Sequence, residues 1–338
     1  MNGRRTSERR TGERESWEPA TRRDNAPATL AFSACAVALV LAACGGGGSG
    51  DASDPDAAAP TPTNRDAVID PAPEFVEPGA YGCEGCPSGL FDDFDVATSE
   101  SSMRFDGIVD DADGNGEFFV RSVDGRTLAG AIPTNANGSF EFTAPLFCGV
   151  QIVKSVWSNE AGRYVLVTEV TSEDCVDADI QLTLNWDELG RDYELHLLEP
   201  GGTINDNESD CTWTSCIGTG PDWGVEGDPG DDPRKDVDDT GAFGPENIRL
   251  AGPVAGTYHV LVEHWGSGDP ASGGSVTFNV DGLTRVAKIA NFPSRSVWDV
   301  GTIEWPSGEI TLDGGVVDCS ESWSSGCRLP LPDRTASP

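Results

Sequence analysis

Short apolar runs that alternate with polar residues recur along the chain from residue 103 onward, and turn-forming residues separate them. Residues 193–199 (Tyr-Glu-Leu-His-Leu-Leu-Glu) and 257–265 (Thr-Tyr-His-Val-Leu-Val-Glu-His-Trp) show the pattern most clearly. A period of two residues is typical of β-strands that bury one face. No long segment has the 3.6-residue period of an amphipathic helix, and the 41 Gly and 23 Pro suit strands joined by turns. The sequence therefore predicts an all-β chain with little helix.

The expected strands form two groups, and this arrangement predicts two β-sandwich domains. The first domain is assigned to residues 81–175. Within it, residues 137–146 (Asn-Gly-Ser-Phe-Glu-Phe-Thr-Ala-Pro-Leu), followed by a strand at 150–159, resemble the bacterial immunoglobulin-like domains of exported proteins. The resemblance implies an immunoglobulin-like sandwich for this part of the chain.

The second domain is assigned to residues 176–316, and a long loop at about 201–246 interrupts its strands. Four motifs flank this loop or lie within it: Trp186-Asp-(x4)-Asp192-Tyr-Glu194-Leu-His196, Pro200-Gly-Gly, Asp236-Val-Asp238-Asp239 and Gly244-Pro-Glu246-Asn247-Ile248. Together they resemble a family of uncharacterised exported bacterial β-sandwich domains, which is similar in outline to pre-peptidase C-terminal domains. The resemblance implies a jelly-roll-like accessory or binding module, and it implies no reaction.

These motifs concentrate carboxylates, which leads to the hypothesis of a calcium site. Alternation along a strand puts Asp192, Glu194 and His196 on the same face. Calcium takes six to eight oxygen ligands, and the acidic run at 231–239 can bring further carboxylates to that face. The candidate ligands are Asp192, Glu194, Asp236, Asp238, Asp239, Glu246 and Asn247. The alternative is a solvated acidic loop whose Asp side chains cap turns.

The first 43 residues have the features of an export signal. An Arg-rich segment precedes an apolar run at 29–43, which is short for a membrane-spanning helix. The run ends in Leu-Ala-Ala-Cys44, which resembles the lipobox of bacterial lipoproteins. The resemblance implies lipid on Cys44, cleavage before it, and transport to the outer membrane because Gly45 follows. Residues 44–80 are rich in Gly, Ser, Asp, Ala and Pro, and predict a disordered linker.

Eight cysteines remain after Cys35 is removed with the signal and Cys44 takes lipid. An even number in an exported chain predicts disulfides, although eight cysteines allow 105 connectivities. Sequence proximity favours the pairs Cys83–Cys86, Cys148–Cys175, Cys211–Cys216 and Cys319–Cys327. The last pair would close a C-terminal tail at residues 317–338.

Charge and motif content narrow the function. A formal net charge of −35 argues against nucleic acid as a partner, because binding to phosphates requires Lys and Arg. The run at 111–116 (Asp-Ala-Asp-Gly-Asn-Gly) matches the start of an EF-hand loop but lacks its final glutamate, so we interpret it as a turn. Several Trp residues either line a carbohydrate or peptide surface or pack in the core and loops, and packing is the commoner fate of Trp. They are Trp213, Trp223, Trp265, Trp298 and Trp305.

The sequence thus predicts an outer-membrane lipoprotein with a non-catalytic binding or structural role, supported by calcium. Its expected partners are the membrane, through Cys44, and an envelope protein or polysaccharide. The alternative function is a hydrolase that acts on an extracellular polymer and uses the acidic loop as its active site. Nothing in the sequence singles out a catalytic pair of acids, and no Gly-x-Ser-x-Gly motif is present.

Overall fold

The structure is a computed structural model, and it describes residues 77–91, 97–98, 101–173, 175, 177–218, 220–241, 243–266, 269–320 and 327. The signal segment at 1–43, the lipidation site Cys44 and the linker up to residue 76 lie outside the described residues. The same is true of 321–326 and 328–338 in the C-terminal tail.

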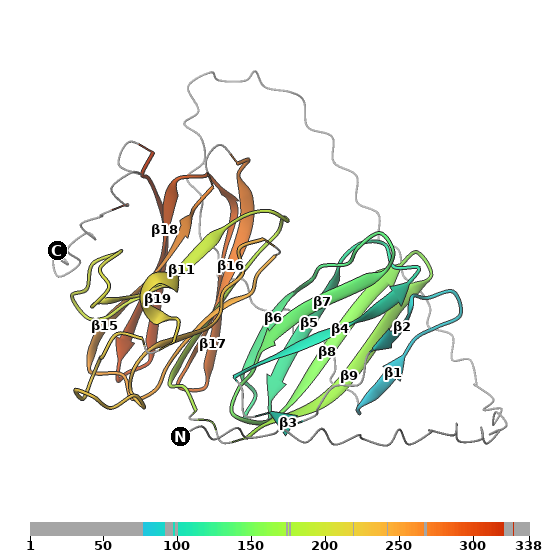
Figure 1. Cartoon of the computed structure of the whole chain (residues 1–338), viewed down its shortest axis with the longest axis horizontal. Helices are drawn as coiled ribbons and strands as arrows, with labels where there is room; N and C mark the ends of the chain where they lie inside the picture. The colour runs from blue at the N-terminus through green and yellow to red at the C-terminus, as the bar shows by residue number, and fades with distance from the viewer. Residues whose placement is uncertain are drawn as a thin grey trace, which may run out of the picture. The chain divides into compact units, whose positions relative to one another are not determined.

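The described part of the chain is all-β, as the sequence predicts, and its antiparallel sheets form two sandwich-like domains (Figure 1). The helix α1 (Trp213–Cys216) is a single turn. Within the described ranges no helix is long and apolar enough to span a bilayer.

The first sandwich consists of a six-stranded and a three-stranded sheet. The larger sheet has the order β1-β9-β8-β5-β6, with β3 beside β9, and the smaller sheet has the order β2-β4-β7. The strands are β1 (Gly79–Tyr81), β2 (Ser88–Phe91), β3 (Ala97–Thr98), β4 (Ser102–Asp110), β5 (Gly116–Ser122), β6 (Thr127–Ile132), β7 (Ser139–Pro145), β8 (Gly149–Asn159) and β9 (Gly162–Ser172). The run at 111–116 connects β4 to β5, in agreement with its interpretation as a turn.

Sequence alternation accounts for the core of the first sandwich. On β5, Phe118 and Val120 are buried, whereas Glu117 and Arg121, which flank them, are exposed. Phe118 stacks on Phe142 of β7 with ring centroids 5.0 Å apart. Apolar faces from both sheets therefore meet in one core, as sandwich packing requires.

The second sandwich consists of two five-stranded sheets. Their orders are β13-β14-β10-β16-β17 and β12-β11-β15-β18-β19, and neighbouring strands in both sheets are antiparallel. The strands are β10 (Ile180–Trp186), β11 (Tyr193–Leu198), β12 (Asp210–Cys211), β13 (Arg234–Val237), β14 (Glu246–Leu250), β15 (Gly256–His264), β16 (Ser272–Val280), β17 (Leu283–Phe292), β18 (Ser296–Trp305) and β19 (Glu309–Asp318).

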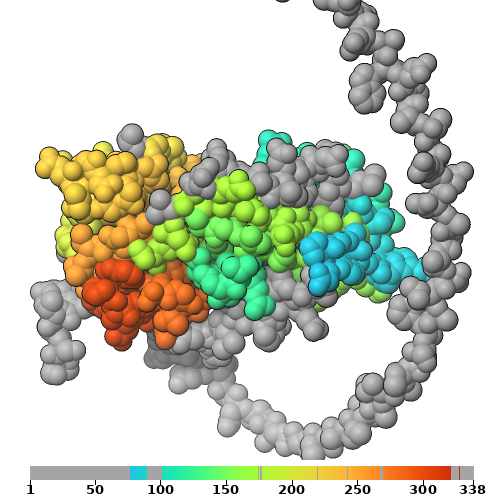
Figure 2. Space-filling model, turned by 90° about the horizontal axis from the view of Figure 1, so that it is seen from below, coloured from blue at the N-terminus to red at the C-terminus, as the bar shows by residue number. Residues whose placement is uncertain are grey.

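Strand β11 has two buried faces of different character. Tyr193, Leu195 and Leu197 belong to the apolar core between the two sheets. By alternation, Glu194 and His196 project from the opposite face, yet their side chains are also buried. Their cover comes from the segment between β11 and β14. In Figure 2, yellow atoms from this part of the chain lie directly against the orange atoms of later strands.

The described part of the chain contains four disulfides, and they join the cysteines that sequence proximity pairs. Their Cα–Cα distances of 5.1, 5.7, 5.0 and 5.5 Å fall in the normal range for the bond. Disulfides form and persist in oxidising compartments, so these bonds indicate an extracytoplasmic protein. The bonds are Cys83–Cys86, Cys148–Cys175, Cys211–Cys216 and Cys319–Cys327.

Candidate functional site

The segment between β11 and β14 folds back over the outer face of β11. Its strand β12 pairs with β11, and the Cys211–Cys216 disulfide closes the turn that contains α1. Further along, the indole of Trp223 donates a hydrogen bond of 2.9 Å to the carbonyl of Glu208 and packs against Tyr258 of β15. The segment therefore forms a lid over the polar face of β11, and polar groups beneath this lid require partners.

A buried charge cluster lies under this lid, centred on Lys235 of β13. The Lys235 ammonium is 2.6 Å from Glu194 Oε1, 2.9 Å from Glu246 Oε2 and 3.0 Å from Asp238 Oδ1. Lys235 and Glu246 have fully buried side chains, that of Glu194 is 4% exposed, and that of Asp238 is 24% exposed. We call these four residues the Lys235 cluster.

Backbone and hydroxyl donors also bind two carboxylates in the Lys235 cluster. Glu194 Oε1 accepts hydrogen bonds from the Thr212 hydroxyl at 2.5 Å and from the Trp213 N–H at 2.8 Å. Glu246 Oε2 accepts one from the Leu195 N–H at 2.6 Å. Glu246 Oε1 is buried and has no hydrogen-bond partner among the described residues. The cluster thus connects β11, β13, β14 and the start of α1.

The protonation of the cluster follows from burial and charge. Burial disfavours the ammonium, but the negative charges of Glu246, Glu194 and Asp238 outweigh it and raise the pKa of Lys235 above its ordinary value. Burial raises the pKa of Glu246 well above the usual range, and the charge of Lys235 offsets this only in part. Next to the cluster, burial and the charges of Glu194 and Asp238 raise the pKa of Asp192 to about 6.

The structure brings together some of the seven predicted calcium ligands. Glu194, Asp238 and Glu246 each offer an oxygen within 4.8 Å of the others, so this acidic triad could hold a metal ion. Asp192 is close enough for its pKa to respond to the charges of Glu194 and Asp238. The carboxylate of Asp239 accepts hydrogen bonds from the N–H groups of Gly241 and Gly244, and its charge contributes to the raised pKa of Asp192.

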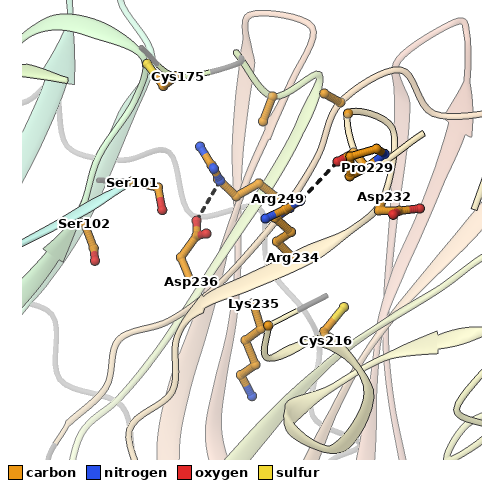
Figure 3. A pocket seen from close by; sticks show the side chains of 14 residues that line it. Ser101, Ser102, Cys175, Cys216, Pro229, Asp232, Arg234, Lys235, Asp236 and Arg249 are labelled. Carbon is orange, nitrogen blue, oxygen red and sulfur yellow. Dashed lines mark hydrogen bonds and ion pairs between the residues drawn. The ribbon is translucent and has the colours of Figure 1, made fainter. Parts of the chain in front are cut away.

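Asp236 and Asn247 lie apart from the acidic triad. Strand β13 turns Lys235 and Asp236 to opposite sides, as Figure 3 shows. Asp236 Oδ2 is 2.8 Å from Arg249 Nε, and it accepts a hydrogen bond of 3.1 Å from Asn247. Burial raises the pKa of Asp236, and Arg249 counteracts this. The seven predicted residues are therefore divided between two separate groups, each with its own basic side chain.

Neither Lys235 nor a second buried group around His196 was predicted from the sequence. His196 Nδ1 is 2.8 Å from Asp210 Oδ2, and Nε2 is 3.5 Å from Glu263 Oε2. Burial opposes protonation, but the charge of Asp210 and its hydrogen bond outweigh it and raise the pKa of His196 to about 10. The sequence does contain a clue to Lys235, since it is the one lysine in the acidic run at 231–239. It contains no clue to Asp210, because only the pairing of β12 with β11 brings Asp210 to His196.

The tryptophans that the sequence singled out have different environments. Trp223 and Trp298 lie in the apolar core of the second sandwich, and Trp305 packs against its edge. Trp213 and Trp265 are 46% and 41% exposed. Only the last two are therefore placed to contact a partner with much of the indole ring.

Comparison with known proteins adds little to this description. No protein-family model matches the chain, and a search of curated protein sequences finds no relative. One similar solved structure is a tetra-tandem repeat in the extending region of a large adhesion protein, with 10% identity, a TM-score of 0.21, and coverage of 68% of this chain and 73% of that one. Another is a chimeric titin Z1Z2–Z1Z2 tandem, with 12% identity, a TM-score of 0.18, and coverage of 60% and 96%. TM-scores this low carry no argument, so the fold rests on the chain's own strand pairing.

Proposed function

We propose that the chain is an exported, lipid-anchored envelope protein with a non-catalytic structural or binding role. The four disulfides support an extracytoplasmic location. The Leu-Ala-Ala-Cys44 motif supports attachment through lipid on Cys44. In this proposal the first sandwich is immunoglobulin-like and acts as a spacer, and the second, jelly-roll-like sandwich contacts an envelope polysaccharide or protein.

One observation carries the non-catalytic part of the proposal: the acids under the lid bind parts of the protein itself. Glu194 accepts hydrogen bonds from the lid, and both Glu194 and Glu246 bind Lys235. A hydrolase needs acids that reach a substrate and exchange protons with it. Glu194 and Glu246 are instead buried and hold the lid against the sheet.

The same arrangement supports a binding role for the lid. The Trp213 N–H is fixed by Glu194, while the Trp213 side chain is 46% exposed. An aromatic ring held on a rigid backbone loses little conformational entropy when a ligand binds to it. Such rings stack on flat apolar faces of a ligand. We therefore propose Trp213 as a contact for the polysaccharide or protein partner.

The acidic triad also has the ligand chemistry of a metal site, although the Lys235 ammonium occupies it. The donors of the acidic triad are carboxylate oxygens, which calcium prefers, so calcium is the ion that suits this site. The ammonium of Lys235 binds one oxygen of each member of the triad. Calcium and Lys235 therefore compete for the same ligands.

Co-sedimentation of the full mature protein with insoluble envelope polysaccharide tests the proposed role, with reducing ends measured in the supernatant. We expect retention without release of fragments, and weaker retention of Trp213→Ala. Trp265→Ala is the matched control, because Trp265 has similar exposure but lies outside the lid. Release of fragments that Glu194→Gln abolishes would establish the hydrolase alternative and reject a non-catalytic role.

A further inference from the structure

We propose that Lys235 is the built-in cation of the acidic triad, in the position that a divalent metal would take, and that removal of its charge converts the cluster into a divalent-cation site. The inference deepens the proposed function and rests on its statement that the cluster holds the lid. If Lys235 takes the place of the metal, the stability of the wild-type protein does not depend on calcium.

The geometry around the ammonium carries the first step. A lysine ammonium has three N–H donors and no acceptor. The Lys235 ammonium has three carboxylate partners at 2.6, 2.9 and 3.0 Å, one from each member of the triad. Acidic oxygens from β11, from β14 and from the residue that follows β13 therefore surround the ammonium.

The second step is competition between cations. Calcium requires oxygen ligands at 2.3–2.6 Å, and the oxygens nearest to its position already bind the ammonium. Two cations within a few ångströms in a buried site repel each other strongly. The triad therefore holds either Lys235 or a divalent ion, and the lysine is tethered to its place by β13.

Removal of the Lys235 charge leaves the buried carboxylates without their cation. Glu194 and Glu246 would be left buried, and like charges that share a site destabilise each other. Glu246 Oε1 is buried and without a partner in the described chain, so it is a further oxygen ready for a metal.

Thermal unfolding of the full mature protein, with disulfides intact, tests the proposal in EDTA and in millimolar calcium. We expect the same Tm for wild type in both buffers. For Lys235→Met we expect a Tm lower by roughly 10 °C in EDTA, since breaking a buried ion pair in a domain of this size has about this effect. Calcium should restore most of that loss, and magnesium less.

Arg249→Met is the matched control. It also removes a cation from buried Asp236, but that carboxylate belongs to the other group. Its Tm should fall and should not recover in calcium. Recovery of both variants would show a general effect of calcium on an acidic chain and would overturn the assignment of the site.

Further outcomes also decide the proposal. A wild-type Tm that falls in EDTA would show that the wild-type protein holds a resident metal, and it would overturn the proposal. A Lys235→Met variant without calcium rescue would show that no divalent site forms, and it would overturn the proposal as well. If Lys235→Met does not fold in any buffer, Lys235→Met/Glu246→Gln provides the test, because it removes one negative charge together with the positive one. This variant should fold in EDTA, and its failure to do so would overturn the proposal. Polysaccharide retention by wild type does not depend on any of these unfolding results. Failure of the proposed function can therefore be distinguished from failure of the proposal for Lys235.

Discussion

The buried contact of His196 with Asp210 and Glu263 predicts a stability that depends on pH. The side chains of His196, Asp210 and Glu263 are 0%, 0% and 2% exposed. The perturbation is His196→Gln, which keeps a polar side chain between the two acids but removes the positive charge. It leaves Asp210 and Glu263 in a buried site without a cationic partner.

The magnitude follows from the pKa of His196. Raising that pKa from 6.5 to about 10 on folding corresponds to about 5 kcal/mol of folding free energy, at about 1.4 kcal/mol per pH unit. Breaking a buried ion pair typically costs about 3–5 kcal/mol, which agrees with the free energy obtained from the pKa shift. Because the folded pKa lies above the unfolded one, this stabilisation is fully present below pH 6.5 and is lost as the pH rises through 10.

Urea unfolding of wild type and His196→Gln at pH 6.5, 8 and 10 measures this effect. We expect wild type to be more stable by about 3–5 kcal/mol at pH 6.5, and the difference to shrink towards zero at pH 10. The comparison cancels other groups that titrate at high pH, since both proteins share them. A difference that stays constant over this range would mean that His196 is neutral in the folded protein, and it would refute the charge assignment.

Three further predictions concern other parts of the chain. Asp192→Asn should stabilise the protein by about 1 kcal/mol at pH 7.5 and hardly at all at pH 4, as measured by urea midpoints at both pH values. The reason is that the pKa of Asp192 is raised to about 6 in the folded protein, so the ionised carboxylate destabilises the fold above pH 6, and solvent screening weakens this effect. Leu195→Ala should cost about 3 kcal/mol, whereas Leu189→Ala, at a side chain 56% exposed, should cost less than about 0.5 kcal/mol, and similar costs would contradict the assigned face of β11. Cys44→Ser should move the protein from the detergent phase to the aqueous phase on Triton partition, and retention in the detergent phase would exclude lipid on Cys44 as the anchor.

Sequence alternation was sufficient to predict the strands that frame the site. It placed Glu194 and His196 on one face of a strand, and the structure puts Tyr193, Leu195 and Leu197 of that strand in the core. Short sequence separation also predicted the disulfides, because a short loop between two cysteines leaves few other partners within reach. These features depend on local periodicity and spacing, which a sequence carries directly.

The arrangement inside the acidic run could not be predicted in the same way. Residues 231–239 were predicted as part of an acidic loop, but pairing with β14 makes Arg234–Val237 a strand. That pairing sends Lys235 to the acidic triad and Asp236 to Arg249. The identity of each carboxylate's partner therefore depends on strand register, which no local pattern specifies.

The exposure of the tryptophans also depends on tertiary structure that no local sequence pattern specifies. Trp213 and Trp223 are ten residues apart in one acidic segment, and composition does not distinguish them. Trp223 is buried because its ring packs on Tyr258 and its N–H bonds the Glu208 carbonyl. The path of the lid over the sheet decides which of the two rings is exposed.

Native-state acylation of the lysines, read out by peptide mass spectrometry, tests the central role of Lys235 most directly. Lys288 is exposed on β17 and serves as the internal control, whereas Lys235 is fully buried with its ammonium bound by three carboxylates. The account predicts rapid modification of Lys288 and protection of Lys235 until denaturant unfolds the second sandwich. Modification of Lys235 at a rate close to that of Lys288 in the folded protein would contradict it.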